Sequence, residues 1–264
     1  MTRSSDNRPG PPSENPVTPP SVAPPSVAPP SRRCGDTGSG ARATETEGLA
    51  RAPSRRGRRI VIVGTGGQGA LTAARLLCDC LVEYGHHVVS GQLHGMAQRG
   101  GSVHTSIKVD CGISPVIAAG RADCVLGFEP VETARALPFM SSQTVVYMNT
   151  APVIPFILGQ RAVLKQGDGR YPNVPGLVDS IRAVTAQVFP FDATRLAQES
   201  GSVKTMNTIM LGCLLGSGLL PRTAEEFWRT VTRVMPPDLV KANAEAFSNG
   251  VKMGRKFLPC EMSP

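Results

Sequence analysis

The segment RRIVIVGTGGQGALTAARLL (58–77) constrains the fold more than any other part of the chain. Residues 60–63 form a short apolar run that ends at glycine, which is typical of a buried parallel strand. Apolar residues then recur at helical spacing from 70 to 85. HHVVSGQL (86–93) has the character of a second strand. We therefore expect a Rossmann-like βαβ unit with a glycine turn between its first strand and its helix.

The turn GTGGQG (64–69) has the spacing G-x-G-x-x-G. Backbone N–H groups and the helix dipole at such a turn favour an anion, usually a phosphate. The alternative is a tight turn without a ligand. A dinucleotide site also needs an acidic residue at the end of the second strand. That strand ends in SGQLH (90–94) without Asp or Glu, so NAD(P) binding is weakly supported.

A second unusual segment, HGMAQRGGSVHTS (94–106), follows the second strand. His94 and Arg99 are the candidate catalytic groups, because they follow a strand end and Arg99 can pair bidentately with a carboxylate or phosphate. The Gly100–Gly101 pair lets the backbone approach a ligand closely, and Gln98 and Ser102 add polar groups. Alternatively, this is a rigid loop in which Arg99 pairs within the protein.

The stretch SVHTSIKVD (102–110) alternates, which predicts a half-buried strand of the kind found in antiparallel sheets. His104 then lies opposite the Val103 face and is a structural or solvent-facing residue. Further strands at 122–128, 144–149 and 188–192 alternate with helical segments, and the last third of the chain is helical. Thr223 and Glu226 have capping-box spacing, and the last helix should stop near Gly250. The fold class is a three-layer α/β/α sandwich with a mostly parallel, mixed sheet.

Composition divides the chain into three parts. Residues 1–58 are rich in Pro and Arg and contain the repeat PPSVAPPSVAPPS, which predicts a disordered N-terminal tail. Residues 59–254 form the domain, and 255–264 a C-terminal tail. The net charge is +8, but no run of basic and aromatic residues indicates nucleic-acid binding. The longest apolar run, 209–220, is too short to span a membrane, so we expect a cytoplasmic protein.

The seven cysteines are scattered and form no CxxC pair, which predicts free thiols and no iron–sulfur or other metal site. Gly167–Asp168–Gly169 matches the start of a thiamine-diphosphate and magnesium motif. However, it lacks the preceding apolar strand and the later Asn, so it predicts a surface turn. On its residues alone, the chain lacks a complete catalytic set.

Five blocks in order resemble one family: GTGGQGALTAARLL, HGMAQRGGSVHTSIKV, ADCVLGFEPVETARALPF, VVYMNT and MNTIMLGCLL. They are similar to the gamma-type domain of 2-oxoacid (pyruvate or ketoisovalerate):ferredoxin oxidoreductases, and within that group to the indolepyruvate:ferredoxin oxidoreductase beta subunit. The resemblance implies a subunit of a complex that oxidatively decarboxylates a 2-oxoacid, an arylpyruvate in the indolepyruvate type. The products are an acyl-coenzyme A and electrons passed to ferredoxin.

The resemblance also implies that this chain binds no cofactor alone. Thiamine diphosphate, Mg and [4Fe-4S] clusters are expected in a larger alpha subunit, with coenzyme A as co-substrate. The motif matches give these cofactor-binding candidates: Gly64, Gly66, Gly67, Gln68, Gly69, Gln98, Arg99, Gly100, Gly101, Ser102 and Asn207. His94, Gly95 and Met96 complete the second motif. Two alternatives stay open: a stand-alone NAD(P)-dependent oxidoreductase, and a diverged, non-catalytic assembly module.

Overall fold

The computed structural model describes residues 57–94, 100–153 and 171–257. Within them, six strands form one mixed sheet in the order β2-β3-β1-β4-β5-β6. Their bounds are β1 Arg58–Thr65, β2 Val88–His94, β3 Ser102–Val109, β4 Cys124–Gly127, β5 Val145–Asn149 and β6 Val188–Phe191. The pairs β1–β4, β4–β5 and β5–β6 are parallel, whereas β3 is antiparallel to both β1 and β2. The expected mixed, mostly parallel sheet is confirmed.

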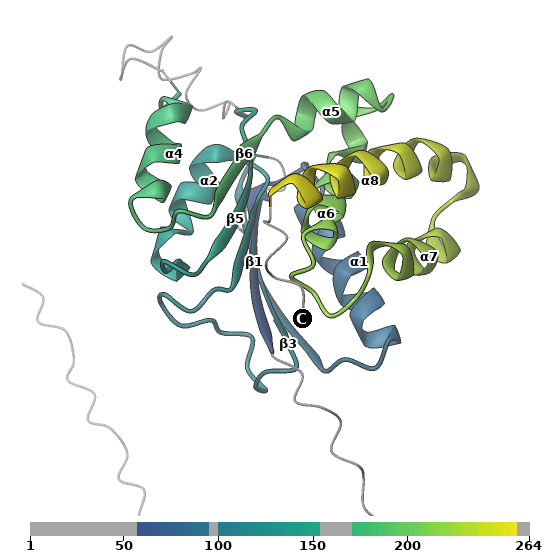
Figure 1. Ribbon diagram of the computed structural model, residues 1–264, viewed down its shortest axis with the longest axis horizontal. Coiled ribbons are helices and arrows are strands. Elements are labelled where there is room, and N and C mark those ends of the chain that lie inside the picture. Colours follow the sequence, from purple (N-terminus) through teal and green to yellow (C-terminus); the bar gives the residue numbers. More distant parts are fainter. Residues whose placement is uncertain (1–56, 95–99, 154–170, 258–264) are drawn as a thin grey trace, which may run out of the picture. The chain divides into compact units, whose positions relative to one another are not determined.

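Helices cover both faces of this sheet (Figure 1). One face carries α2 and α4, and the other carries α1 and the C-terminal helices. The helix bounds are α1 Ala70–Glu83, α2 Pro130–Arg135, η1 Leu137–Phe139, α4 Val174–Arg182, α5 Ala193–Glu199, η2 Val203–Thr205, α6 Met206–Gly216, α7 Ala224–Val234 and α8 Pro237–Phe257. The three-layer α/β/α sandwich is therefore confirmed.

The core has two parts because alternate residues of each strand face opposite sides. Ile60 and Ile62 pack with α1, α6 and α8, whereas Val61 and Val63 pack with α4 and the segment after α2. On β3, the residues Val103, Thr105, Ile107 and Val109 are all buried. The alternation in the sequence therefore predicted this strand and its buried face correctly.

The two strands of the first βαβ unit are separated in the sheet by a third strand, and the sequence of the unit does not reveal this. β3 lies between β1 and β2, so these two strands run in the same direction without being neighbours. In a dinucleotide-binding Rossmann unit the two strands are adjacent, and the second strand ends beside the glycine turn. Here the strand beside β1 on that side is the antiparallel β3, and β2 lies beyond it.

Helix α8 does not end at Gly250, so that prediction was wrong. The helix continues to Phe257, three residues beyond the domain end expected at 254. A Cβ atom on Gly250 would overlap the carbonyl oxygen of Ile209 in α6, so the glycine permits close helix packing. This contact keeps a glycine inside the helix, where local propensity alone would favour a helix end.

Candidate functional site

The candidate site lies at the carboxyl ends of β1 and β4, two adjacent parallel strands. The helix after β1, α1, packs on one face of the sheet, and the helix after β4, α2, packs on the other (Figure 1). The chain therefore diverges here to opposite sides of the sheet. Such a switch point leaves a crevice outside the strand ends, where α/β proteins bind ligands.

The two glycine-rich segments meet at this point in a β-bulge. The amide of Gly66 donates to the carbonyl of Gly101 over 2.8 Å, and the amide of Gly100 donates to the carbonyl of Gly66 over 3.2 Å. Gly100 and Gly101 thus both lie opposite the single residue Gly66, which is the arrangement of a β-bulge. Gly100 has φ +75°, as the first residue of a G1 bulge requires. An L side chain at residue 100 would be strained in this left-handed conformation. The Gly-Gly pair therefore joins β3 to the glycine turn.

Gln68 uses its carboxamide inside the protein. Its Oε1 accepts from the amide of Thr65 over 2.8 Å, and its Nε2 donates to the carbonyl of Phe128 over 3.0 Å. Asn149 Nδ2 donates to the same carbonyl over 3.0 Å. The side chain of Gln68 thus closes the turn and ties it to the end of β4.

The N-terminus of α1 opens into a cavity of about 360 Å³. The helix begins after Gly69, and its first turn contains no acidic residue. The cavity wall includes Lys204, Gly67 and Asn207. A Cβ atom on Gly69 would lie 3.2 Å from the side chain of Asn207, so the two residues are in contact range. Free N–H groups, the helix dipole and the lysine all favour an anion here.

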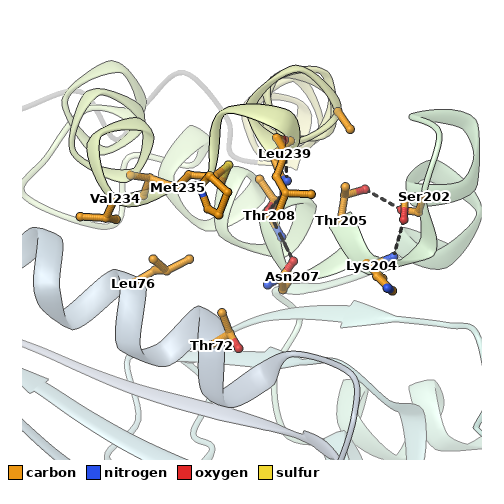
Figure 2. A pocket seen from close by; sticks show the side chains of 14 residues that line it. Thr72, Leu76, Ser202, Lys204, Thr205, Asn207, Thr208, Val234, Met235 and Leu239 are labelled. Atoms are coloured by element: carbon orange, nitrogen blue, oxygen red, sulfur yellow. Dashed lines mark hydrogen bonds between the residues drawn. The ribbon is translucent and has the colours of Figure 1, made fainter.

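A second cavity of about 320 Å³ adjoins the first and shares Thr72, Lys204 and Asn207 with it. Figure 2 shows Thr72 and Leu76 of α1 on one side of it, with Val234, Met235 and Leu239 on the other. Its walls are mainly apolar, although a hydrogen bond of 2.6 Å joins Thr208 Oγ1 to Asn243 Oδ1 beside it. Together the cavities form a groove, with the N-terminus of α1 and Lys204 at one end and a mainly apolar channel at the other. We call this the α1 groove.

Two buried carboxylates lie on the α2 side of the switch point. Glu129 and Glu132 are only 2% and 7% exposed. The hydroxyl of Ser102 donates to Glu132 Oε2, and Tyr171 donates to Glu129 Oε1. Glu129 Oε2 accepts from the amide of Glu132 over 2.9 Å and so caps α2. Burial and the adjacent Glu129 raise the pKa of Tyr171.

Sequence reasoning assigned no role to these two acids. The signal was present, because FEPVE places an acid directly after an apolar strand and a second one three residues later, around a proline. Thr65 lies beside Ser102 in the β1–β3 pair. Its hydroxyl is buried and makes no hydrogen bond within the described part of the chain. The hydroxyl of Ser102, in contrast, donates to Glu132. Ser102 therefore anchors the start of β3 to that carboxylate rather than to the α1 groove.

The structure brings together many, but not all, of the candidates from the sequence. Residues 64–69, Gly100, Gly101, Ser102 and Asn207 gather around the end of β1. His94 is the last residue of β2, whereas Gly95, Met96, Gln98 and Arg99 lie outside the described residues, as does the Gly167–Asp168–Gly169 turn. The catalytic assignments of His94 and Arg99 therefore stay predictions.

His104 faces away from the glycine turn, on the α2 side of β3. Its ring lies 5.0 Å from that of Phe139, and a ring nitrogen is 3.0 Å from Ser106 Oγ. Burial lowers the pKa of His104. The structural role expected for this residue agrees with these contacts.

The described cysteines are free thiols: Cys78, Cys80, Cys111, Cys124 and Cys213. Burial raises the pKa of Cys80 to about 11 and raises those of Cys124 and Cys213 further. Buried thiols of this kind stay protonated and are unreactive. In the described ranges, no group of three or more His, Cys, Asp or Glu residues could hold a metal ion. No helix in the same ranges is long and apolar enough to cross a membrane.

The chain folds into an α/β domain whose two glycine segments form one structure at a switch point of the sheet. Residues 59–253 match the family described as pyruvate ferredoxin/flavodoxin oxidoreductase, and the chain belongs to this family. The resemblance found in the sequence is thereby confirmed.

Named relatives agree with this assignment. The chain is 34% identical to indolepyruvate oxidoreductase subunit IorB of Archaeoglobus fulgidus over 191 residues, which is 72% of this chain and 92% of the relative. It is also 34% identical to IorB of Pyrococcus horikoshii, covering 75% and 96% of the two chains. Identity to 2-oxoglutarate synthase subunit KorC of A. fulgidus is 28%, with coverage of 75% and 88%. These relatives are subunits of 2-oxoacid oxidoreductases.

Solved structures share the fold. The gamma subunit of a keto/oxoacid ferredoxin oxidoreductase from Geobacter sulfurreducens matches with a TM-score of 0.52 at 18% identity, over 75% of this chain and 99% of that one. A 2-oxoglutarate:ferredoxin oxidoreductase from Magnetococcus marinus, with 2-oxoglutarate, coenzyme A and succinyl-CoA bound, matches with a TM-score of 0.57 at 14% identity. The match covers 77% of this chain but only 32% of that larger chain. The same fold therefore occurs both as a separate subunit and within a longer chain.

Proposed function

We propose that this chain is the small subunit of an arylpyruvate:ferredoxin oxidoreductase, with indolepyruvate as the representative substrate. The complex would decarboxylate the 2-oxoacid oxidatively, transfer the acyl group to coenzyme A and pass electrons to ferredoxin. The observation that carries this proposal is the identity of 34% to two IorB subunits over 92% and 96% of their lengths. The lower identity of 28% to a 2-oxoglutarate synthase subunit favours the arylpyruvate type.

We place the redox cofactors in a larger alpha subunit. Thiamine diphosphate supplies the carbanion chemistry in such a reaction, and iron–sulfur clusters carry the electrons. The described residues of this chain do not fit a cluster, because no three or more of their Cys, His, Asp or Glu side chains come together where they could hold a metal. This chain would then bind and position a substrate that the partner transforms.

The α1 groove is suited to coenzyme A, which is one of the molecules bound in the M. marinus enzyme. A phosphate of coenzyme A would lie at the N-terminus of α1 within reach of Lys204. The less polar pantetheine arm would follow the apolar channel past Leu76 and Met235. The groove would thereby bind the acyl acceptor and keep water from its arm.

Co-purification tests the assignment as a subunit. Affinity-tagged chain would be isolated from its native cells, and the eluate analysed for a larger protein, bound iron and sulfide, and thiamine diphosphate. We expect one larger subunit carrying all three. A chain that is folded and remains alone in the eluate would contradict the proposal and favour the assembly-module alternative. An adjacent gene for a thiamine and iron–sulfur subunit would argue against that alternative.

Lys204→Gln tests the groove in the assembled complex. Removing one exposed cation near a phosphate should raise the KM for coenzyme A by about two- to fivefold, corresponding to roughly 0.5–1 kcal/mol, with kcat retained. The matched control is Lys252→Gln, on an exposed part of α8 that does not line the groove. Equal KM values for the two variants would remove Lys204 from the site.

Arg99→Ala tests the second motif in the same assay. We expect lower turnover of the complex with this chain still folded. Unchanged turnover and unchanged coenzyme A dependence would remove Arg99 from the candidates.

The NAD(P) alternative has less support. Only the spacing of the glycine turn favours it, whereas β3 separates the turn from the end of β2. Titration of the isolated chain with NAD(H) and NADP(H) tests this alternative, since tight binding would favour a stand-alone oxidoreductase. The domain boundaries at 59 and 254, the cytoplasmic location and the absence of nucleic-acid and membrane partners remain predictions.

A further inference from the structure

The two edges of the sheet differ in their capacity to pair with another strand. One edge is β6, which contains Pro190 and so lacks one backbone donor. The other edge is β2, with the sequence VVSGQLH. β2 contains neither proline nor a charged residue, the two features that usually protect an edge strand. Within the described residues, its outer side is therefore the edge that is open to pairing.

The hydrogen-bond pattern identifies the backbone groups that point outward. The amide of Asp110 donates to the carbonyl of His87 over 2.8 Å, which makes residues 87 and 110 a hydrogen-bonded pair. Such pairs alternate along an antiparallel ladder. Val89, Gly91 and Leu93 therefore bond to β3. The backbone groups of Val88, Ser90, Gln92 and His94 point away from it.

An apolar surface lies beside this open edge. Leu93 is 72% exposed, and Val116 in the loop after β3 is 71% exposed. Both line a shallow cavity of about 340 Å³ together with Phe139. Two large aliphatic side chains, Leu93 and Val116, thus lie together next to the outward backbone groups.

The strand is complementary to itself. If two copies of β2 pair antiparallel around Gly91, Ser90 forms a hydrogen-bonded pair with Gln92 of the other copy. Val89 then lies opposite Leu93 of the other copy, so aliphatic side chains meet across the new ladder. All seven residues pair, and the strand contains no Asp, Glu, Lys or Arg that would place like charges opposite each other.

We propose that β2 is a homodimerisation strand, which joins two copies of this chain through an antiparallel β2–β2 pair centred on Gly91. A two-fold axis gives this isologous contact, in which each copy supplies the same residues. The pairing satisfies the outward backbone groups and covers Leu93. The proposal stands apart from the oxidoreductase assignment, because it rests on the edge alone.

A proline substitution in the open edge tests the pairing. Gln92→Pro removes an outward N–H and leaves the β3 ladder intact, because residue 92 makes no ladder bond to β3. Its matched control, Gln92→Ala, keeps the N–H. By sedimentation of the full-length chain we expect a dimer for the wild type and Gln92→Ala, and a monomer for Gln92→Pro. Circular dichroism and thermal unfolding would show that each variant is folded.

A cross-link tests the register even if the proline variant fails to fold. Val89→Cys combined with Leu93→Cys places two thiols opposite each other in a non-hydrogen-bonded pair, where Cβ atoms are close enough for a disulfide. Mild oxidation should yield a covalent dimer of the double variant well above the background that the native free thiols give in either single variant or the wild type. The same cross-link should form within the purified complex.

A folded wild-type chain that sediments as a monomer, both alone and after release from its complex, would overturn the proposal. So would a dimer that Gln92→Pro leaves intact, or the absence of the Val89–Leu93 cross-link. Each of these outcomes is independent of whether a larger cofactor-containing subunit co-purifies. Failure of this proposal is therefore distinguishable from failure of the proposed function.

Discussion

Gly66 and Gly101, 35 residues apart in the sequence, are joined by a backbone hydrogen bond of 2.8 Å. This bond belongs to a G1 bulge whose third member, Gly100, has a left-handed backbone. The bulge makes the glycine turn and the start of β3 one structure, so a change in either segment will displace the other.

Gly100→Ala should therefore affect both stability and function. An L residue in the left-handed region costs about 1–2 kcal/mol, which urea unfolding will measure. We expect the activity of the assembled complex to fall as well, because the strain displaces the turn. Gly112→Ala is the control, since Gly112 has φ +78° in the loop after β3, away from the turn. Equal activity losses in the two variants would refute a special role for the bulge.

The surroundings of two helical glycines predict opposite effects of replacing each with alanine. Gly250→Ala should destabilise the domain by about 1–3 kcal/mol, because its Cβ would overlap the carbonyl of Ile209. Gly176→Ala in α4 should stabilise it by up to about 1 kcal/mol, since nothing lies within 4 Å of the new methyl group. Urea unfolding of each variant measures these changes in the free energy of unfolding. Stabilisation by Gly250→Ala would show that the two helices pack less closely.

The hydrogen bond between Ser102 and Glu132 anchors β3 to α2. A double-mutant cycle with Ser102→Ala and Glu132→Gln should give a coupling energy of about 0.5–2 kcal/mol, because the acceptor is a buried carboxylate. The exposed ion pair Arg195–Glu199, at 3.4 Å, serves as the comparison and should give at most about 0.5 kcal/mol. A Ser102–Glu132 coupling no larger than that would mean that the anchor contributes little to stability.

His104 should make the stability depend on pH. Burial lowers its pKa below the ordinary 6.5, so the unfolded chain binds the proton more tightly than the folded one. Stability from this group is complete above pH 6.5 and decreases as the pH falls toward the folded pKa. Urea unfolding between pH 7.5 and 5.5 should therefore show a smaller decrease for His104→Gln than for the wild type. Identical decreases in the two proteins would exclude His104 as the source of the pH dependence.

Much of the candidate site could be read from the sequence because its parts are local. The strand, glycine turn and helix at 58–83 follow one another directly, and glycines mark the turn and the bulge. Glu129 and Glu132 were missed as site residues because their hydrogen-bond partners, Tyr171 and Ser102, are distant in sequence. Arg99 was proposed from its chemistry alone and lies outside the described residues.

The sequence by itself determined the elements. Periodicity predicted the half-buried β3, and side-chain spacing predicted the capping box of Thr223 and Glu226, whose two hydrogen bonds the structure contains. Such features arise from interactions among residues a few positions apart. The tertiary structure alone decided that β3 lies between β1 and β2, that Asn207 meets Gly69, and that α8 continues through Gly250. These outcomes depend on packing between remote segments, where burial of shared surface outweighs local propensity.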